Sequence, residues 1–487
     1  MRALKILAFA IGFIISSVLQ AAPQRPNMIV ILCDDLGYGD LGIHGHPHIQ
    51  TPNLDALASS GIRFSNFYST APVCSPSRVG LMTGRSPNRA GVYDWIPPGG
   101  RSRPDARDQV HMRSDEITMP QLLKTAGYAT CMAGKWHCNS QFNDASQPQP
   151  GDVGFDHWFA TQNNAAPSHA NPQNYVRNGQ SVGPLKGFSC QIVADEAMGW
   201  IGQQQQADSD QPFFVYMAFH EPHEPVASPA ELVEQYLAVT DNRNQAEYFA
   251  NVHNVDIAVG RLVKYLEQQK LRDNTLVVFT SDNGPETLNR YRSAKRSWGV
   301  TGVHRGMKLH THDGGIHVAG LLSWPRAVKA GQVIRQPVSA LDLLPTMVDL
   351  AGSSLPQDRI FDGISLASLL TKGQFPNRIK PLIWAYYNAI NQAKVAMRFG
   401  SWKVLASLDG GKFPQLQNLT LKTKQQLEQA ELTDFEIYNV NTDPGETQNL
   451  YGRDQLSSKE QQKLLQQLKS GYAELLTNSP VWMPKPE

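Results

Sequence analysis

The stretch that decides the fold is NMIVILCDD, residues 27–35, an apolar run that ends in two acids. The glycine-rich LGYGDLG follows it directly. A continuous apolar run bounded by a polar loop is typical of a strand that is buried on both faces, as in a parallel sheet. We therefore predict a buried strand that carries Asp34 and Asp35 at its carboxyl end.

Helices and apolar strands alternate after this stretch. Residues 51–69 and 118–137 each predict a helix, a glycine stop and a strand. Residues 211–225 predict a strand that ends in polar residues and prolines, and residues 247–284 predict a long amphipathic helix followed by a buried strand. This alternation predicts an α/β fold with a large, mixed but mostly parallel sheet sandwiched by helices, whose ligands bind beyond the carboxyl ends of the strands.

The sequence pattern changes after about residue 375. PLIWAYY (381–387), KVAMRFGSWKVLA (394–406) and FEIYNV (435–440) predict short strands, and residues 457–478 predict a helix. We expect a catalytic domain over 23–375 and a smaller C-terminal α+β domain with an antiparallel sheet over 376–487.

The first 22 residues predict a cleaved signal peptide. Arg2 and Lys5 precede the apolar run at 6–19, and small residues follow at Ala21 and Ala22. The run is shorter than the roughly 20 residues that span a bilayer, so we expect no membrane anchor after cleavage. The predicted location is periplasmic or secreted.

Composition excludes two further classes of protein. The formal charge is +1 and basic residues do not cluster, so no nucleic-acid partner is expected. The chain has 5 cysteines, an odd number and too few for a disulfide scaffold of 487 residues. Cys33 is interpreted as core filling, while a bridge between Cys131 and Cys138 stays open.

Acids follow two of the apolar runs. Asp34 and Asp35 end the first, and Asp282 and Asn283 end a later one. Buried carboxylates need a compensating cation, and oxygen ligands suit Ca²⁺ or Mg²⁺. The alternative is that each pair merely starts a turn.

Basic residues also lie just after apolar runs: Arg78, Lys135, His137, His223 and Lys308. Cations beside a metal indicate an anionic substrate with oxygens to bind. The alternative is that each is an exposed surface charge.

Cys74 lies in APVCSPSRVGLMTGRSP, residues 71–87. A thiolate nucleophile would need a nearby base and an oxyanion hole, and no cysteine-protease signature surrounds this residue. From the residues alone, a nucleophile, half of a disulfide and a buried side chain all remain open.

The segment CSPSRVGLMTG, residues 74–84, resembles the signature of the type I sulfatases, C-x-P-S-R followed by L-T-G, with Met82 in place of the usual leucine. CDDLGYGDLG, GKWH, EPHEP, NTLVVFTSDNGP, HRGMKLHTHDGGIHV and DPGETQNL are similar to further family blocks and occur in the same order. The resemblance implies an alkaline phosphatase-like fold and a sulfuric ester hydrolase similar to exported bacterial polysaccharide sulfatases.

The resemblance also implies a mechanism. Cys74 would be oxidised to formylglycine (3-oxoalanine) by a formylglycine-generating or an anaerobic sulfatase-maturating enzyme. Its hydrate would attack sulfur, and the second hydroxyl would let the sulfated hemiacetal collapse to the aldehyde. Ca²⁺, with Mg²⁺ as the alternative, would be bound by Asp34, Asp35, Cys74, Asp282 and Asn283. The remaining roles would be stabilisation of the nucleophile by Arg78, sulfate binding by Lys135 and Lys308, acid catalysis by His223 and proton removal by His137.

Substrate recognition is the least determined part. THDGGIHV has Asp313 where the family usually has Glu and His317 where Arg is common. Candidate substrate-binding residues are Asn163, Asn164, His169, His220, Arg305, His310, His312 and His317. The loop over 93–115, rich in Pro, Gly and Arg, is expected at the mouth of the site.

The expected substrate is a sulfated carbohydrate, either a carrageenan-type galactan or a glycosaminoglycan. The alternatives are an arylsulfatase of small esters, a phosphoester or phosphonate ester hydrolase on the same scaffold, and a glycan-binding protein without activity.

Overall fold

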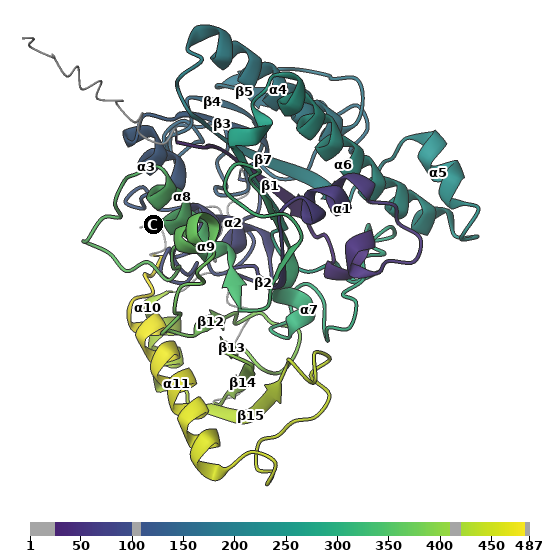
Figure 1. Ribbon diagram of the computed structural model, residues 1–487. Coiled ribbons are helices and arrows are strands. Elements are labelled where there is room, and N and C mark those ends of the chain that lie inside the picture. Colours follow the sequence, from purple (N-terminus) through teal and green to yellow (C-terminus); the bar gives the residue numbers. More distant parts are fainter. Residues whose placement is uncertain (1–24, 100–108, 410–419, 483–487) are drawn as a thin grey trace, which may run out of the picture.

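The computed structural model describes residues 25–99, 109–409 and 420–482. The predicted signal peptide lies outside these residues, as does the middle of the predicted loop over 93–115. Within the described ranges the chain forms one large sheet between two layers of helices and a smaller sheet with a helix on one face (Figure 1).

The larger sheet has eleven strands among the described residues, in the order β10-β2-β9-β8-β1-β7-β3-β4-β5-β6, with β11 also paired to β2. Its central strands β8, β1, β7, β3 and β4 run parallel to one another, whereas β9 is antiparallel to both β2 and β8. The bounds are β1 (Asn27–Asp34), β2 (Ile62–Tyr68), β3 (Ala129–Lys135), β4 (His157–Thr161), β5 (Val176–Arg177), β6 (Gln180–Ser181), β7 (Phe213–Pro222), β8 (Thr275–Ser281), β9 (His317–Ser323), β10 (Gln332–Ile334) and β11 (Val338–Ser339).

Helices cover both faces of this sheet. The bounds are α1 (Pro52–Ser59), α2 (Cys74–Thr83), α3 (Met119–Thr125), α4 (Ser189–Ala207), α5 (Ala230–Tyr236), α6 (Arg243–Gln268), α7 (Asp313–Ile316), α8 (Leu343–Leu350) and α9 (Ala367–Lys372). Short 3-10 turns add η1 (Tyr38–Asp40), η2 (Gly42–His44), η4 (Arg272–Asn274) and η5 (Ala340–Asp342).

Alternation along β1 explains the two layers, because successive side chains of a strand point to opposite faces. Met28, Val30 and Leu32 belong to the core that contains residues of α2, α3, α8 and α9. Ile29 and Ile31 belong to the core that contains residues of α1, α4 and α6. Each face is therefore shielded from water, as a parallel sheet requires.

The smaller sheet consists of β12 (Leu382–Ala385), β13 (Val395–Phe399), β14 (Trp402–Leu408) and β15 (Leu432–Asn439), all antiparallel in that order. α11 (Ser458–Thr477) packs on one face, and α10 (Leu421–Gln429) lies beside α11. The other face packs against Tyr68, Ile316 and Leu341 of the larger unit. The small sheet is thus joined to the end of the large sheet where its ligands are expected.

The predicted fold class is confirmed, including the antiparallel C-terminal sheet. The boundary between 375 and 376 stays a prediction. Cys33 is fully buried in the core as expected. A bridge between Cys131 and Cys138 does not form, since the cysteines are free.

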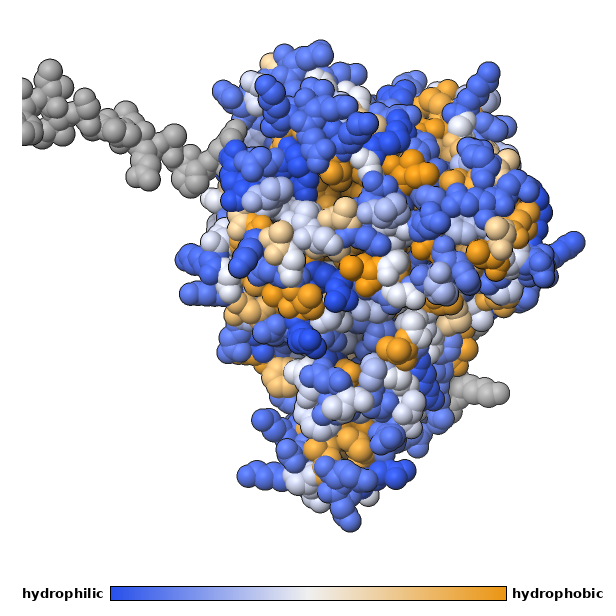
Figure 2. Space-filling view, turned by 45° about the vertical axis from the view of Figure 1, so that its right-hand side comes forward, coloured by the Kyte–Doolittle hydropathy of each residue, from blue (hydrophilic) through white to orange (hydrophobic). Residues whose placement is uncertain are grey.

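Figure 2 shows one face of the molecule, on which hydrophilic side chains predominate and apolar ones form small groups. Among the residues that the structure describes, no helix is long and apolar enough to cross a membrane.

Candidate active site

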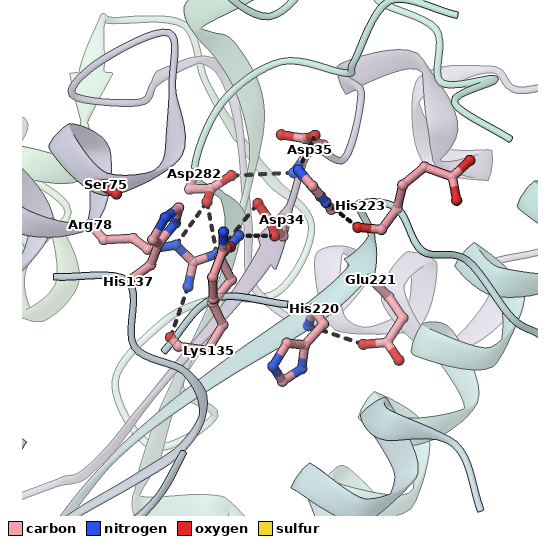
Figure 3. Close-up of polar contacts among 12 residues, drawn as sticks. Asp34, Asp35, Ser75, Arg78, Lys135, His137, His220, Glu221, His223 and Asp282 are labelled. Atoms are coloured by element: carbon pink, nitrogen blue, oxygen red, sulfur yellow. Dashed lines mark hydrogen bonds and ion pairs between the residues drawn. The ribbon is translucent and has the colours of Figure 1, made fainter. Parts of the chain in front are cut away.

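The predicted metal and sulfate ligands converge at the carboxyl ends of neighbouring strands. β1 ends at Asp34, β3 ends at Lys135, β7 is followed by His223 and β8 is followed by Asp282. Because these four strands are parallel neighbours, their ends meet at one edge of the sheet (Figure 3). Residues far apart in the sequence are brought together by topology alone.

Three carboxylates and an amide form the acidic part of the site. The backbone N–H of Asp35 donates to Oδ1 of Asp282 at 3.2 Å, and the amide of Asn283 donates to Oδ1 of Asp35 at 2.7 Å. Asp35 has a φ of 64°, an uncommon conformation for a residue other than glycine that costs on the order of 1–3 kcal/mol. Asp34 and Asp282 are essentially inaccessible to solvent.

Three buried cations face these acids. Nε of Arg78 donates a hydrogen bond to Oδ2 of Asp282 at 2.9 Å, and Nη2 of Arg78 lies 2.7 Å from the same oxygen. Nη2 also lies 3.7 Å from Oδ1 of Asp34. Lys135 pairs with Asp34. Lys308 lies 2.7 Å from Asp35. Removing any one cation would leave a buried carboxylate with less compensation.

Burial raises the pKa of two of these acids, whereas nearby basic residues hold the pKa of the third low. Burial raises the pKa of Asp35 to about 6, although Lys308 opposes the change. Burial and the nearby Asp34 raise the pKa of Asp282 to about 7. For Asp34 burial acts in the same direction, but Lys135, His223 and Arg78 outweigh it and hold the pKa well below its usual range.

This donor set fits a hard divalent cation. Ligand atoms of Asp34, Asp35 and Cys74 lie within 4.8 Å of one another. Oδ1 of Asp34 and Oδ1 of Asn283 are buried, and no described residue donates a hydrogen bond to either. Oxygen atoms from carboxylates and amides are the ligands that Ca²⁺ prefers, and a cation here would satisfy both.

Cys74 is the first residue of α2, and it lines the same cavity as Lys308. Its side chain is almost completely buried, and burial raises the pKa of the thiol although Lys308 and Lys135 oppose the change. An unmodified thiol here is therefore protonated at neutral pH and a poor nucleophile. The amino end of a ten-residue helix instead favours negative charge developing at this position.

Two histidines complete the floor of the cavity. Nε2 of His137 contacts the carbonyl of Ile96 at 3.0 Å, and no described residue contacts its buried Nδ1. Nδ1 of His223 contacts the carbonyl of Glu224 at 2.5 Å, and Nε2 lies 3.6 Å from Asp35. Burial lowers the pKa of His137 well below its usual range and that of His223 to about 3, so both rings are neutral at neutral pH.

The cavity above these residues has a volume of about 720 Å³, which is in the range of small-molecule sites. Asn163 and Asn164 line it, and their side-chain oxygens have no hydrogen-bond donor among the described residues. Aromatic side chains also contribute to the walls, namely Trp95, Tyr291 and Tyr386.

The other candidate substrate-binding residues lie outside this cavity. His220 contacts Thr161 and Ser189, and in Figure 3 it lies with Glu221 to one side of the acids. His169 lies 3.9 Å from Glu221, His310 contacts backbone carbonyls in its own turn, and His312 lies 3.9 Å from Glu436. Arg305 contacts Tyr438 and Glu446, and His317 packs against Tyr38 and His304. Their proposed contact with substrate stays a prediction that the geometry does not favour.

The sequence reasoning missed several residues that line the cavity. Asp94 and Trp95 come from the loop expected at the mouth of the site, Arg290 follows β8, and Tyr386 and Asn388 follow β12. The loop was signalled by its Pro and Gly content. No sequence signal indicated that a turn of the small sheet would reach the site.

Residues 26–353 match the sulfatase family, and residues 307–405 match the C-terminal domain of N-sulphoglucosamine sulphohydrolase.

The chain belongs to the sulfatase family.

Among its relatives, this sulfatase is 32% identical to the N-acetylgalactosamine-6-sulfatase of Canis lupus familiaris over 87% of the chain and 81% of the relative. It is 32% identical to human arylsulfatase A over 89% of the chain and 84% of that protein. Among solved structures, Ps i-CgsB in complex with k-i-k-neocarrahexaose superposes with a TM-score of 0.75 and 28% identity, covering 94% of each chain. The sulfatase is therefore a sulfuric ester hydrolase with an alkaline phosphatase-like fold.

Proposed function

We propose that this sulfatase removes sulfate from a sulfated carbohydrate, using formylglycine formed from Cys74 and a Ca²⁺ ion. The observation that carries the proposal is the meeting of three buried acids and three buried cations beside Cys74 at the amino end of α2. Such a cluster is costly to bury and is retained where it binds charge.

Asp34, Asp35, Asp282 and Asn283 would hold Ca²⁺ together with the modified Cys74. When bound, Ca²⁺ and Arg78 would favour an ionised hydroxyl on the formylglycine hydrate at neutral pH. Lys135 and Lys308 would bind the sulfate oxygens and stabilise the charge that develops on them in the transition state.

The two histidines would move protons at defined atoms. Because Nδ1 of His223 is engaged with the carbonyl of Glu224, Nε2 is the nitrogen that would carry the proton to the leaving oxygen. The negative charge of a bound sulfate ester would raise the pKa of His223 back towards its usual range and so favour the protonated ring. Because Nε2 of His137 is engaged with the carbonyl of Ile96, Nδ1 is the atom that would accept a proton from the second hydroxyl.

The walls of the cavity support a carbohydrate as the leaving group. Aromatic rings such as Trp95 pack against the apolar face of a sugar, and Asp94 and Asn388 offer polar atoms for hydroxyls. Two of the relatives point the same way, since one is named an N-acetylgalactosamine-6-sulfatase and one was solved with neocarrahexaose. A small aryl ester would leave much of this cavity unfilled.

Three expectations from the sequence belong to the same proposal. The segment 1–22 directs export to the periplasm or the exterior, and a formylglycine-generating or anaerobic maturating enzyme modifies Cys74. The catalytic domain spans 23–375, and the domain over 376–487 contributes Tyr386 and Asn388 to the cavity.

The proposal is tested by measuring released sulfate from a panel of sulfated galactan and glycosaminoglycan oligosaccharides, together with an aryl sulfate and a phosphate diester. We expect a sulfated oligosaccharide to give the highest kcat/KM. Cys74→Ala is expected to abolish turnover, whereas Cys190→Ala, a matched change at a buried cysteine on α4, is expected to retain it. A higher kcat/KM for the phosphate diester would refute the proposal.

A further inference from the structure

One wall of the active-site cavity carries a cation that has no part in the proposed reaction. Arg290 lies in the loop after β8 and lines the cavity together with Tyr291 and Lys308. Its side chain is 34% exposed, and its guanidinium carbon lies 5.0 Å from the centroid of the Tyr291 ring. The guanidinium of Arg290 is thus accessible from the cavity, and the ring of Tyr291 packs against one side of it.

Glu286 fixes the orientation of this guanidinium. Its Oε1 accepts a hydrogen bond from Nε of Arg290 at 2.7 Å, and its Oε2 accepts one from Nη2 at 2.6 Å. Glu286 is itself buried, and it also accepts a hydrogen bond from the backbone N–H of Thr287. No described residue accepts a hydrogen bond from Nη1 of Arg290. A pre-oriented guanidinium with donors to spare is suited to binding a carboxylate or a sulfate.

The same carboxylate links Arg290 to the reaction centre. Oε2 of Glu286 lies 3.9 Å from Nζ of Lys308, so two cations lie side by side around one oxygen atom. Asp35, the other partner of Lys308, is a proposed ligand of Ca²⁺. Glu224, which also lines the cavity, is paired with Arg296 at 3.0 Å. With Ca²⁺ bound, the described charges around Arg290 and Lys308 therefore sum to a net positive charge.

An acid, Asp94, also lines the cavity and contacts residues that follow β12 of the small sheet. Asp94 accepts hydrogen bonds from the hydroxyl of Tyr386 at 3.0 Å and from the amide of Asn388 at 2.7 Å. Asp94 and Asn388 therefore add polar atoms to a cavity that Arg290 and Lys308 also line. An anionic substituent on the substrate is attracted to Arg290 and Lys308.

We propose that Arg290 binds a second sulfate group of the substrate, next to the sulfate ester that is cleaved. The inference rests on the proposed function and narrows it to glycans with closely spaced negative charges. Glu286 is the positioning residue for this contact. The hydroxyls of the same sugar face Asp94 and Asn388.

The test is a comparison of binding affinities in a Cys74→Ala background, in which no ester is hydrolysed. Galactose 6-sulfate and the galactose disulfates with the second sulfate at position 2, 3 or 4 are titrated by calorimetry in the presence of Ca²⁺. We expect at least one disulfate to bind about tenfold or more tightly than the monosulfate, the size of one charge-assisted contact. Arg290→Gln is expected to reduce this advantage to less than about threefold, and Arg290→Lys to retain part of it.

Arg243→Gln serves as the matched control, because Arg243 is an exposed arginine on α6 that pairs with Glu234. It is expected to retain the full advantage of the disulfate. The inference is overturned if no disulfate binds more tightly than the monosulfate, or if the advantage survives in Arg290→Gln. Release of sulfate from a sulfated oligosaccharide by the unaltered enzyme tests the proposed function separately, so that either claim can fail without the other.

Discussion

Replacing Arg78 by methionine tests whether the buried charges are balanced as the structure indicates. Arg78 is completely inaccessible to solvent, contacts Asp282 at 2.9 and 2.7 Å and donates to the carbonyl of Lys135 at 3.0 Å. Methionine has a similar volume but no charge, so Asp282 and Asp34 would lose a partner while packing is largely kept. Breaking a buried ion pair from one side costs about 3–5 kcal/mol, and we expect a loss of this size in the free energy of unfolding.

A double-mutant cycle separates lost charge from lost packing. If the cost arises from the unpaired carboxylate, Asp282→Asn combined with Arg78→Met should be less destabilising than the sum of the two single changes, by about 2 kcal/mol. Urea unfolding is followed by circular dichroism and by tryptophan fluorescence, with a chelator present so that no metal masks the charge.

Arg243→Met is the control, since Arg243 is exposed and an exposed ion pair contributes less than about 1 kcal/mol. A cost below about 1 kcal/mol for Arg78→Met, or strict additivity in the cycle, would refute the reasoning.

Three further predictions concern pH, metal and leaving group. Burial raises the pKa of Asp40 to about 7, above the value of about 3.9 in an unfolded chain. The contribution of Asp40 to the free energy of unfolding is therefore fully present below about pH 4 and is lost as the pH rises to about 7. The stability of the unaltered protein relative to Asp40→Asn should therefore fall by about 4 kcal/mol between pH 4 and pH 8 in urea unfolding, and a flat difference would show that Asp40 is ionised throughout. Removal of Ca²⁺ by a chelator should lower the melting temperature, and added Ca²⁺ should restore it, because ligand binding to the folded state alone is stabilising; an unchanged melting curve would contradict the metal assignment. His223→Gln should reduce kcat by about 10²–10⁴-fold for a sugar sulfate but much less for an aryl sulfate, whose leaving group needs no proton, and equal losses on both substrates would exclude acid catalysis.

Much of the fold could be predicted because local pattern and global arrangement agree. The run at 27–35 is buried on both faces and ends in acids, and that pattern alone places β1 in the centre of a parallel sheet. The antiparallel strands of the small sheet could be predicted for a similar reason, since short apolar segments recur there at close intervals. The helix that begins at Cys74 was not predicted, because CSPSR carries no helical periodicity.

The centre of the site could be predicted for a physical reason, whereas its walls could not. Asp34, Lys135 and Asp282 lie at or directly after strand ends, where parallel topology brings them together. Tyr386 and Asn388 reach the cavity only because the small sheet packs against the large one. No local sequence pattern predicts how two sheets pack together. His317 shows the converse, since this histidine lies within a block that resembles the family, yet it packs against Tyr38 and His304.

Mass spectrometry of the tryptic peptide over 64–78, from enzyme produced with its maturating enzyme and shown to be active, tests the central claim most directly. The account predicts that Cys74 in this peptide has the mass of formylglycine, and that the modified fraction rises in proportion to specific activity. Fully active enzyme in which Cys74 is an unmodified cysteine throughout would contradict it.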